Sequence, residues 1–176
     1  MSNVQNTTLY HEKQSKQFCL MHTLNNILQK KHYTAEKMDE LCYTINDRKW
    51  FNPHRSWLGF GNYDANVLMC ALELHHLKMV WFDKRTLGGQ LNPDKIRAFI
   101  FNIPSRSFFH MLSGRHWYPL VKVSGDKWYN LDSKLSSPKA ITDLPKTVGE
   151  HLAQKDVEMI IVCHEDIPPI DLFIAH

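Results

Sequence analysis

The chain is 176 residues long, with 43% hydrophobic and 22% charged residues, a composition typical of a globular protein with one domain. Its formal net charge of +3 comes from Lys and Arg residues that are spread along the chain, which argues against a nucleic-acid-binding stripe. No apolar run approaches the roughly 20 residues that span a bilayer, and residues 1–8 lack the layout of a signal peptide. We therefore expect a cytoplasmic protein, with the nucleus as a second compartment.

The cysteines and histidines do not form a metal-binding pattern. The four cysteines occur singly, as Cys19, Cys42, Cys70 and Cys163, and none belongs to a CxxC pair. Among the eleven histidines there is no HExxH motif. A structural zinc site therefore has no support in the sequence, and a reducing compartment argues against disulfides. We expect no metal and no cofactor.

Residues 14–29 combine a short polar lead with a helical pattern. Apolar residues recur there at three- and four-residue spacing, which predicts a helix with one apolar face: Leu20, Leu24, Ile27 and Leu28. Cys19 falls in the first turn, where free backbone N–H groups and the helix dipole favour a thiolate. The alternative is that Cys19 is one more small buried hydrophobe. Taken alone, the pattern favours this second interpretation.

The remaining elements follow in the order of an α+β fold. Helices are expected at about residues 19–31, 34–45 and 64–76, the second capped by Thr34 and the third by Asn62 or Asp64. Strands are expected at 78–82, 98–103 (closed by Pro104), 116–123, 127–132 and 158–163, with a short helix after Asn92 and a fourth long helix at 143–154. Residues 46–62 form an aromatic-rich loop, equally compatible with packing and with a contact surface, and residues 105–115 form an apolar loop.

The strands at 116–123 and 127–132, joined by a Ser-Gly-Asp turn, are the clearest hairpin in the chain. In the register that places Tyr118 opposite Asp132, His116 is the diagonal neighbour of Asp132, and the two side chains share a face. A slip of one residue would place them on opposite faces.

Cys19, His116 and Asp132 are therefore candidates for one catalytic site. A nucleophilic cysteine needs a base in hydrogen-bond reach and a third group that orients the base. A carboxylate beside an imidazole favours the imidazolium, which in turn favours a thiolate. Each residue also has a structural alternative, because His116 can be a partly buried strand histidine and Asp132 a turn residue. The residues alone leave the two interpretations about evenly balanced.

Five motifs, in the same order, resemble the Josephin family. They are Tyr10-His-Glu-Lys-Gln14, the helix Cys19–Gln29, Gly61-Asn-Tyr-Asp64, Arg115-His-Trp117 and Tyr129-Asn-Leu-Asp-Ser133. Within the family the chain looks most like the small stand-alone Josephin proteins. The resemblance implies a papain-like cysteine protease fold, with N-terminal helices, a mostly antiparallel sheet and a helical flap. It also implies one catalytic domain at 9–165, with 1–8 and 166–176 as short terminal extensions.

The resemblance assigns roles to six residues. Cys19 is the nucleophile, His116 the general base and acid, Asp132 the orienting residue and Gln14 the oxyanion-hole side chain; Trp117 and His75 are implied substrate contacts. Other family members can carry Asn at the third catalytic position, so the acidic residue departs from part of the family. Pro119, inside the strand that follows His116, is also unusual, because proline in a sheet is confined to edges and bulges.

The implied activity is hydrolysis of isopeptide or peptide bonds at the C-terminal glycine of ubiquitin, through a Cys-His-Asp triad and a thioester. The expected partners are ubiquitin and ubiquitinated proteins, and the expected enzyme is a monomer. One alternative is a module of the same fold that binds ubiquitin without cutting it. Another is a papain-like peptidase or acyltransferase that acts on small substrates.

Overall fold

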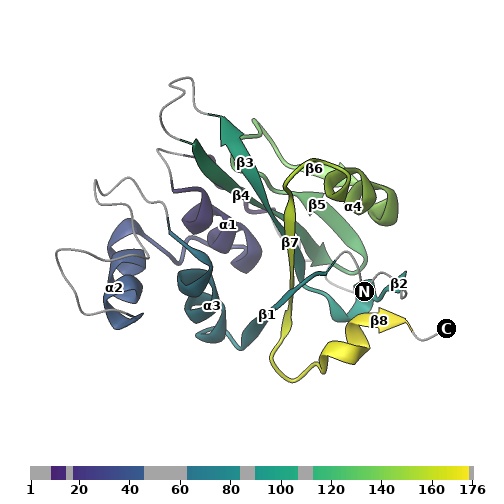
Figure 1. The fold of residues 1–176 in the computed structure, drawn as a ribbon, viewed down its shortest axis with the longest axis horizontal. Coiled ribbons are helices and arrows are strands. Elements are labelled where there is room, and N and C mark those ends of the chain that lie inside the picture. The colour runs from purple at the N-terminus through teal and green to yellow at the C-terminus, as the bar shows by residue number, and fades with distance from the viewer. Residues whose placement is uncertain (1–8, 15–17, 46–62, 84–89, 107–112, 175–176) are drawn as a thin grey trace, which may run out of the picture.

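The structure is a computed structural model that describes residues 9–14, 18–45, 63–83, 90–106 and 113–174. Its central sheet has six strands in the order β1-β7-β3-β4-β5-β6, and every neighbouring pair is antiparallel. A separate two-stranded sheet pairs β2 with β8. Helices and a mostly antiparallel sheet confirm the expected α+β class (Figure 1).

The elements have the following bounds. The helices are α1 (Cys19–Leu28), α2 (Ala35–Ile45), α3 (Ala65–Glu73) and α4 (Leu144–Leu152), with 3₁₀ turns η2 (Pro93–Lys95) and η3 (Pro169–Leu172). The strands are β1 (Leu77–Trp81), β2 (Gln90–Leu91), β3 (Ala98–Arg106), β4 (Ser113–Ser124), β5 (Lys127–Asn130), β6 (Lys139–Ile141), β7 (Glu158–His164) and β8 (Phe173–Ile174).

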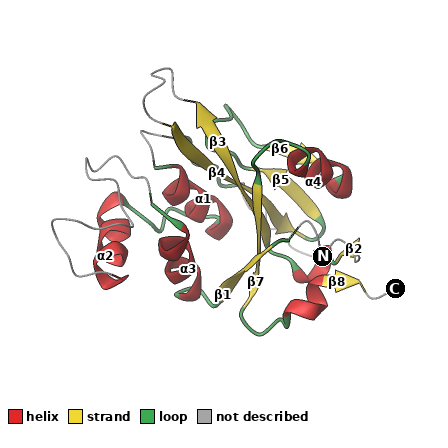
Figure 2. Cartoon of the chain, viewed as in Figure 1, coloured by secondary structure: helices red, strands yellow, loops and turns green. Residues whose placement is uncertain are grey.

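The helices divide between the two faces of the sheet. Helices α1, α2 and α3 lie together on one side, whereas α4 lies on the other (Figure 2). Each face has its own apolar core. The first includes Leu20, Leu24, Leu68, Ile100 and Trp117, and the second includes Phe99, Phe101, Tyr118, Trp128 and Val148. The alternation of strand side chains therefore separates a core around α1 from a core under α4.

Several predicted boundaries are wrong by a few residues. Helix α1 ends at Leu28 rather than near Lys31, because Gln29 adopts a left-handed conformation with φ 55° that ends the helix. Helix α3 ends at Glu73, before the predicted His76. The short strands β2, β6 and β8 were not predicted, because strands of two or three residues carry too little periodicity to recognise.

The prediction that Pro104 closes β3 is also wrong, since the strand continues to Arg106. β7 pairs with β3 only from Ala98 to Asn102, so that edge of β3 is free at Pro104. A missing N–H costs no ladder bond at such an edge. Pro119 lies just beyond the last β5 pair, where its carbonyl still accepts from Leu131 N–H at 3.0 Å. The Leu131 carbonyl, which would be the partner of the missing Pro119 N–H, accepts from Asn26 Nδ2 instead.

The β4–β5 hairpin has the register expected near the candidate site. Ser124 pairs with Lys127 across a two-residue turn, in which Gly125 has φ 53°. An irregularity between Lys122 and Ser124 then shifts the ladder, so that Leu120 lies opposite Asn130. That pair belongs to the same register as the predicted Tyr118–Asp132 pair, although β5 itself ends at Asn130.

The end of the chain packs on the domain. Leu172 in η3 is fully buried, its carbonyl accepts from Asn92 N–H at 2.8 Å, and β8 pairs with β2. Residues 169–174 of the expected terminal extension therefore pack against the domain. The aromatic-rich loop at 46–62 and the apolar residues 107–112 lie outside the described residues. Within the described ranges, every helix is too short or too polar to cross a lipid bilayer.

Candidate active site

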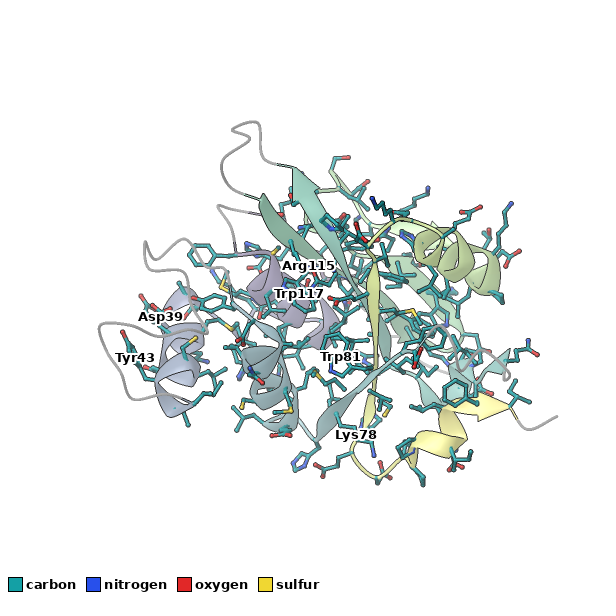
Figure 3. The ribbon with its side chains drawn as sticks, in the orientation of Figure 1. Asp39, Tyr43, Lys78, Trp81, Arg115 and Trp117 are labelled. Atoms are coloured by element: carbon teal, nitrogen blue, oxygen red, sulfur yellow. The ribbon has the colours of Figure 1, made fainter. Side chains whose placement is uncertain are left out.

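Cys19 is the first residue of α1, which packs against the open edge of β4. Beyond the last β5 pair, the carbonyl of Arg115 faces Cys19, whose Sγ–H donates to it at 4.0 Å. The preceding residue, Phe18, has no side chain that can cap the helix. The first turn of α1 contains no acidic residue, so no carboxylate of that turn lies beside the sulfur. Figure 3 shows Arg115 and Trp117 beside the start of this helix.

The resting state of Cys19 differs from the sequence prediction. Burial raises the pKa of the Cys19 thiol above its ordinary value. The backbone N–H groups of Trp117 and Leu20 and the charge of Lys134 lower this pKa, but by less than burial raises it. The side chain is 5% exposed. Desolvation of the thiolate outweighs the helix start here, so a base is needed to remove the proton.

His116 and Asp132 meet as the hairpin register requires. His116 Nε2 donates to Asp132 Oδ1 at 2.7 Å, and the imidazole is almost fully buried. The other face of the ring stacks on Tyr118, with centroids 5.7 Å apart. Because Nε2 is occupied by the carboxylate, Nδ1 is the nitrogen left to accept a proton. Since Arg115 and Trp117 both contact Cys19 through their backbones, His116 lies on the segment that borders the thiol.

Asp132 is held as a carboxylate. Burial raises its pKa, but the hydrogen bond from His116, the backbone N–H of Lys134 and the positive charge of both residues outweigh burial. Its pKa therefore lies below the ordinary value of 3.8. Lys134 N–H donates to Oδ1 at 2.9 Å, and Asn130 Oδ1 accepts from Asp132 N–H at 2.9 Å. The side chain is thus fixed by a tight turn as well as by the histidine.

Gln14 lies beside the turn that carries Asp132. Its backbone N–H donates to the carbonyl of Ser133 at 2.8 Å, and its side-chain oxygen accepts from Ser133 Oγ at 3.4 Å. That contact uses the oxygen of the amide, and the NH₂ group is the donor end of the same side chain. The structure thus brings Gln14 to the same turn as Asp132, across 119 residues of sequence.

The two expected substrate contacts are placed differently. Trp117 is 6% exposed and belongs to the core around α1, and it also lines a cavity of about 300 Å³ with Tyr63, Trp81, Arg115 and Glu158. His75 follows the C-terminal end of α3, and its ring contacts the rings of His32 and Tyr33 at centroid distances of 4.6 and 5.7 Å. The ring contacts of His75 are therefore not with the Cys19 group, and its role in substrate binding stays a prediction.

Several residues of this region were missed at the sequence level. The polar face of α1, which includes His22, Asn25 and Asn26, is as buried as the apolar face. The lead segment at 9–14 covers it: Glu12 N–H donates to Asn26 at 2.7 Å, and His11 Nε2 bonds the carbonyl of Asp132 at 3.0 Å. The signal was the absence of any charged residue from Leu20 to Gln29, which is unusual for a helix face in water.

Within the described ranges, no group of three or more His, Cys, Asp or Glu side chains is arranged to hold a metal ion.

Comparison with known proteins identifies the family of the chain. Residues 14–163 match the sequence profile of the Josephin family. A Josephin-like protein of Drosophila melanogaster is 40% identical over 170 residues, which cover 90% of this chain and 75% of that protein. Human Josephin-2 is 40% identical over 167 residues, covering 91% and 88%. Human ataxin-3 is 24% identical over 178 residues, covering 92% of this chain and 46% of ataxin-3. The chain belongs to the Josephin family.

Proposed function

We propose that this protein is a deubiquitinating thiol protease, which hydrolyses isopeptide or peptide bonds at the C-terminal glycine of ubiquitin. The observation that carries the proposal is the 2.7 Å bond between His116 and Asp132 on the segment of β4 that borders Cys19. Family membership and the resemblance to ubiquitin-cleaving members support ubiquitin as the substrate.

In the proposed first step, His116 Nδ1 takes the proton of the Cys19 thiol, and the sulfur attacks the carbonyl carbon of the glycine. Asp132 keeps the imidazole in the tautomer that leaves Nδ1 free and stabilises the imidazolium that forms. The raised pKa of Cys19 fits a mechanism in which the proton is transferred when substrate is bound, since burial opposes a resting thiolate.

The oxyanion that develops needs N–H donors. The proposed donors are the Gln14 side-chain amide and the Cys19 backbone N–H at the uncapped start of α1. One such donor contributes about 3–4 kcal/mol in comparable sites. His116 then protonates the leaving amine as the C–N bond breaks. Water attacks the resulting thioester, with His116 as base, and releases ubiquitin with a free carboxylate while the thiol is restored.

The experiment is hydrolysis of ubiquitin bearing a C-terminal fluorophore, compared with a generic peptide ester. We expect release from the ubiquitin substrate, abolished in Cys19→Ala and retained in Cys70→Ala, where the replaced thiol lies on α3. A preference for the peptide ester would instead assign a peptidase of small substrates. If the wild type binds ubiquitin but neither cleaves it nor reacts at Cys19 with a thiol-reactive ubiquitin probe, the protein is a binding module.

A further inference from the structure

The polar face of α1 carries a buried amide that joins two parts of the candidate site. Asn26 is fully buried. Its Nδ2 donates to the carbonyl of Leu131 at 2.8 Å, and its Oδ1 accepts from Glu12 N–H at 2.7 Å. Leu131 directly precedes Asp132, and Glu12 lies two residues before Gln14. The Asn26 side chain, on the helix that begins at Cys19, thus bonds the segment that leads to Gln14 and the segment that leads to Asp132.

Further bonds close this arrangement. His11 Nε2 bonds the carbonyl of Asp132 at 3.0 Å, and Gln14 N–H donates to the carbonyl of Ser133 at 2.8 Å. Leu131 is itself fully buried, and its N–H donates to Pro119 on the strand that carries His116. A displacement of Leu131 would therefore move the Asp132 carboxylate relative to the imidazole that it orients.

The neighbouring amide, Asn25, provides a contrast. It is equally buried, and its side chain accepts from His32 N–H and Tyr33 N–H and donates to Tyr33 O and Glu12 Oε2. Three of these four bonds fix the chain between α1 and α2. Both amides satisfy buried backbone groups, so both should contribute to stability. Only Asn26 bonds the segment that leads into Asp132.

We propose that Asn26 is a positioning residue of the reaction, which sets Gln14 and Asp132 relative to Cys19 through Glu12 N–H and Leu131 O. This inference rests on the proposed catalytic group but not on the identity of the substrate. Asn26 acts through the backbone and touches neither the reacting sulfur nor the imidazole. A small displacement of an orienting group is expected to lower the rate of the chemical step, because reactivity depends steeply on geometry.

The test compares Asn26→Leu with Asn25→Leu in the full chain. The readout is the rate of Cys19 carbamidomethylation by iodoacetamide against pH, followed by mass spectrometry of the Cys19 peptide. This reaction needs no ubiquitin. In Asn26→Leu we expect the acidic limb of the profile to move to lower pH by about half a unit or more and the plateau rate above it to fall, since a displaced carboxylate favours the imidazolium less. In Asn25→Leu we expect the limb to stay in place.

Ubiquitin-fluorophore hydrolysis adds a second readout. In Asn26→Leu, kcat should fall about tenfold or more with KM changed less than about twofold, whereas Asn25→Leu should keep kcat at a temperature where both are folded. If the wild type fails to cleave ubiquitin, the proposed function is wrong, but the alkylation profiles still decide the role of Asn26.

His11→Phe covers the case in which Asn26→Leu does not fold by circular dichroism. His11 is only half-buried, and its replacement removes the direct bond to the Asp132 carbonyl. Its profile should shift in the same direction as that expected for Asn26→Leu. Equal pH profiles for folded Asn26→Leu and Asn25→Leu would overturn the inference. If Asn26→Leu does not fold, an unshifted His11→Phe profile would overturn it instead.

Discussion

The starts of α1 and α4 are built in opposite ways. Helix α4 is capped by Asp143, whose carboxylate accepts from Lys146 N–H at 3.0 Å, and α3 is capped in the same way by Asp64. The N-cap position of α1 is Phe18, which offers no capping group. A cap stabilises a helix by occupying free N–H groups. Phe18 provides no such cap at α1, and in the proposed mechanism the N–H groups at this helix start are donors for the negative charge that develops on the substrate oxygen and on sulfur.

The comparison also explains why a carboxylate is kept away from the sulfur. An Asp cap at Phe18 would place a negative charge beside a thiol whose pKa burial already raises. The carboxylate described near this helix, Asp132, instead bonds His116 Nε2. Substitutions around the start of α1 should therefore change the rate of hydrolysis far more than the free energy of unfolding. Substitutions at the start of α4 should change the free energy of unfolding far more than the rate.

The largest effect is expected for His116→Ala. Without the base, the buried thiol has no proton acceptor, so kcat/KM for ubiquitin-fluorophore hydrolysis should fall by about 10³-fold or more. His76→Ala is the matched control, since that exposed histidine pairs with Glu165 outside the site. A His116→Ala variant that keeps more than about a tenth of wild-type activity would contradict the assignment of the base.

Gln14→Ala tests the donors at the open helix start. We expect kcat to fall about 10²-fold with little change in KM, because the lost hydrogen bond forms only as the oxyanion develops. Ser133→Ala separates this role from anchoring, since it removes the hydroxyl that donates to Gln14 Oε1 and leaves the Gln14 NH₂ group intact. Similar losses in both variants would show that Gln14 acts by packing alone.

Asp132→Asn should have a smaller effect on rate, of about tenfold. The amide oxygen can still accept from His116 Nε2, but it no longer stabilises the imidazolium by charge. Steady-state kinetics at neutral pH measures the loss. Asp132→Ala, which removes the acceptor too, should lose more. An Asn variant as slow as the Ala variant would mean that charge outweighs orientation.

The same substitution predicts a pH dependence of stability. The pKa of Asp132 is lower in the folded state than its ordinary value of 3.8, so its carboxylate stabilises the fold above that value and loses this effect as the pH falls through the folded-state pKa. The difference in free energy of unfolding between wild type and Asp132→Asn should therefore shrink below about pH 4 in urea titrations. A difference that does not change with pH would contradict the charge-based account of this contact.

The smallest effect on rate is expected for Asp143→Ala. Loss of the α4 cap should cost about 1 kcal/mol of unfolding free energy and lower Tm by a few degrees. Thermal denaturation measures this loss, and kcat/KM at a temperature well below Tm should equal that of the wild type. A clear fall in kcat/KM would show that the two helix starts are coupled rather than separate in function.

Part of this architecture could be predicted because it depends on local periodicity. The three- and four-residue spacing of Leu20, Leu24 and Ile27 predicted α1, and side-chain alternation with the hairpin turn predicted that His116 and Asp132 share a face. The strands that contain Pro104 and Pro119 were harder, because a proline is acceptable only where the neighbouring strand has ended. That depends on the lengths of β5 and β7 and not on the residues around the prolines.

The sequence by itself determined the helix that begins at Cys19 and the shared face of His116 and Asp132, since both follow from the 3.6- and two-residue periods of the backbone. Gln14 was assigned to the site only through its family motif, because helix and strand periodicity cannot relate it to residues more than a hundred positions away. Only the tertiary structure decided that the polar face of α1 is buried under residues 9–14, and that burial of Cys19 raises the pKa of its thiol. Burial depends on what packs against a residue, and in this protein the packing partners come from distant segments of the chain.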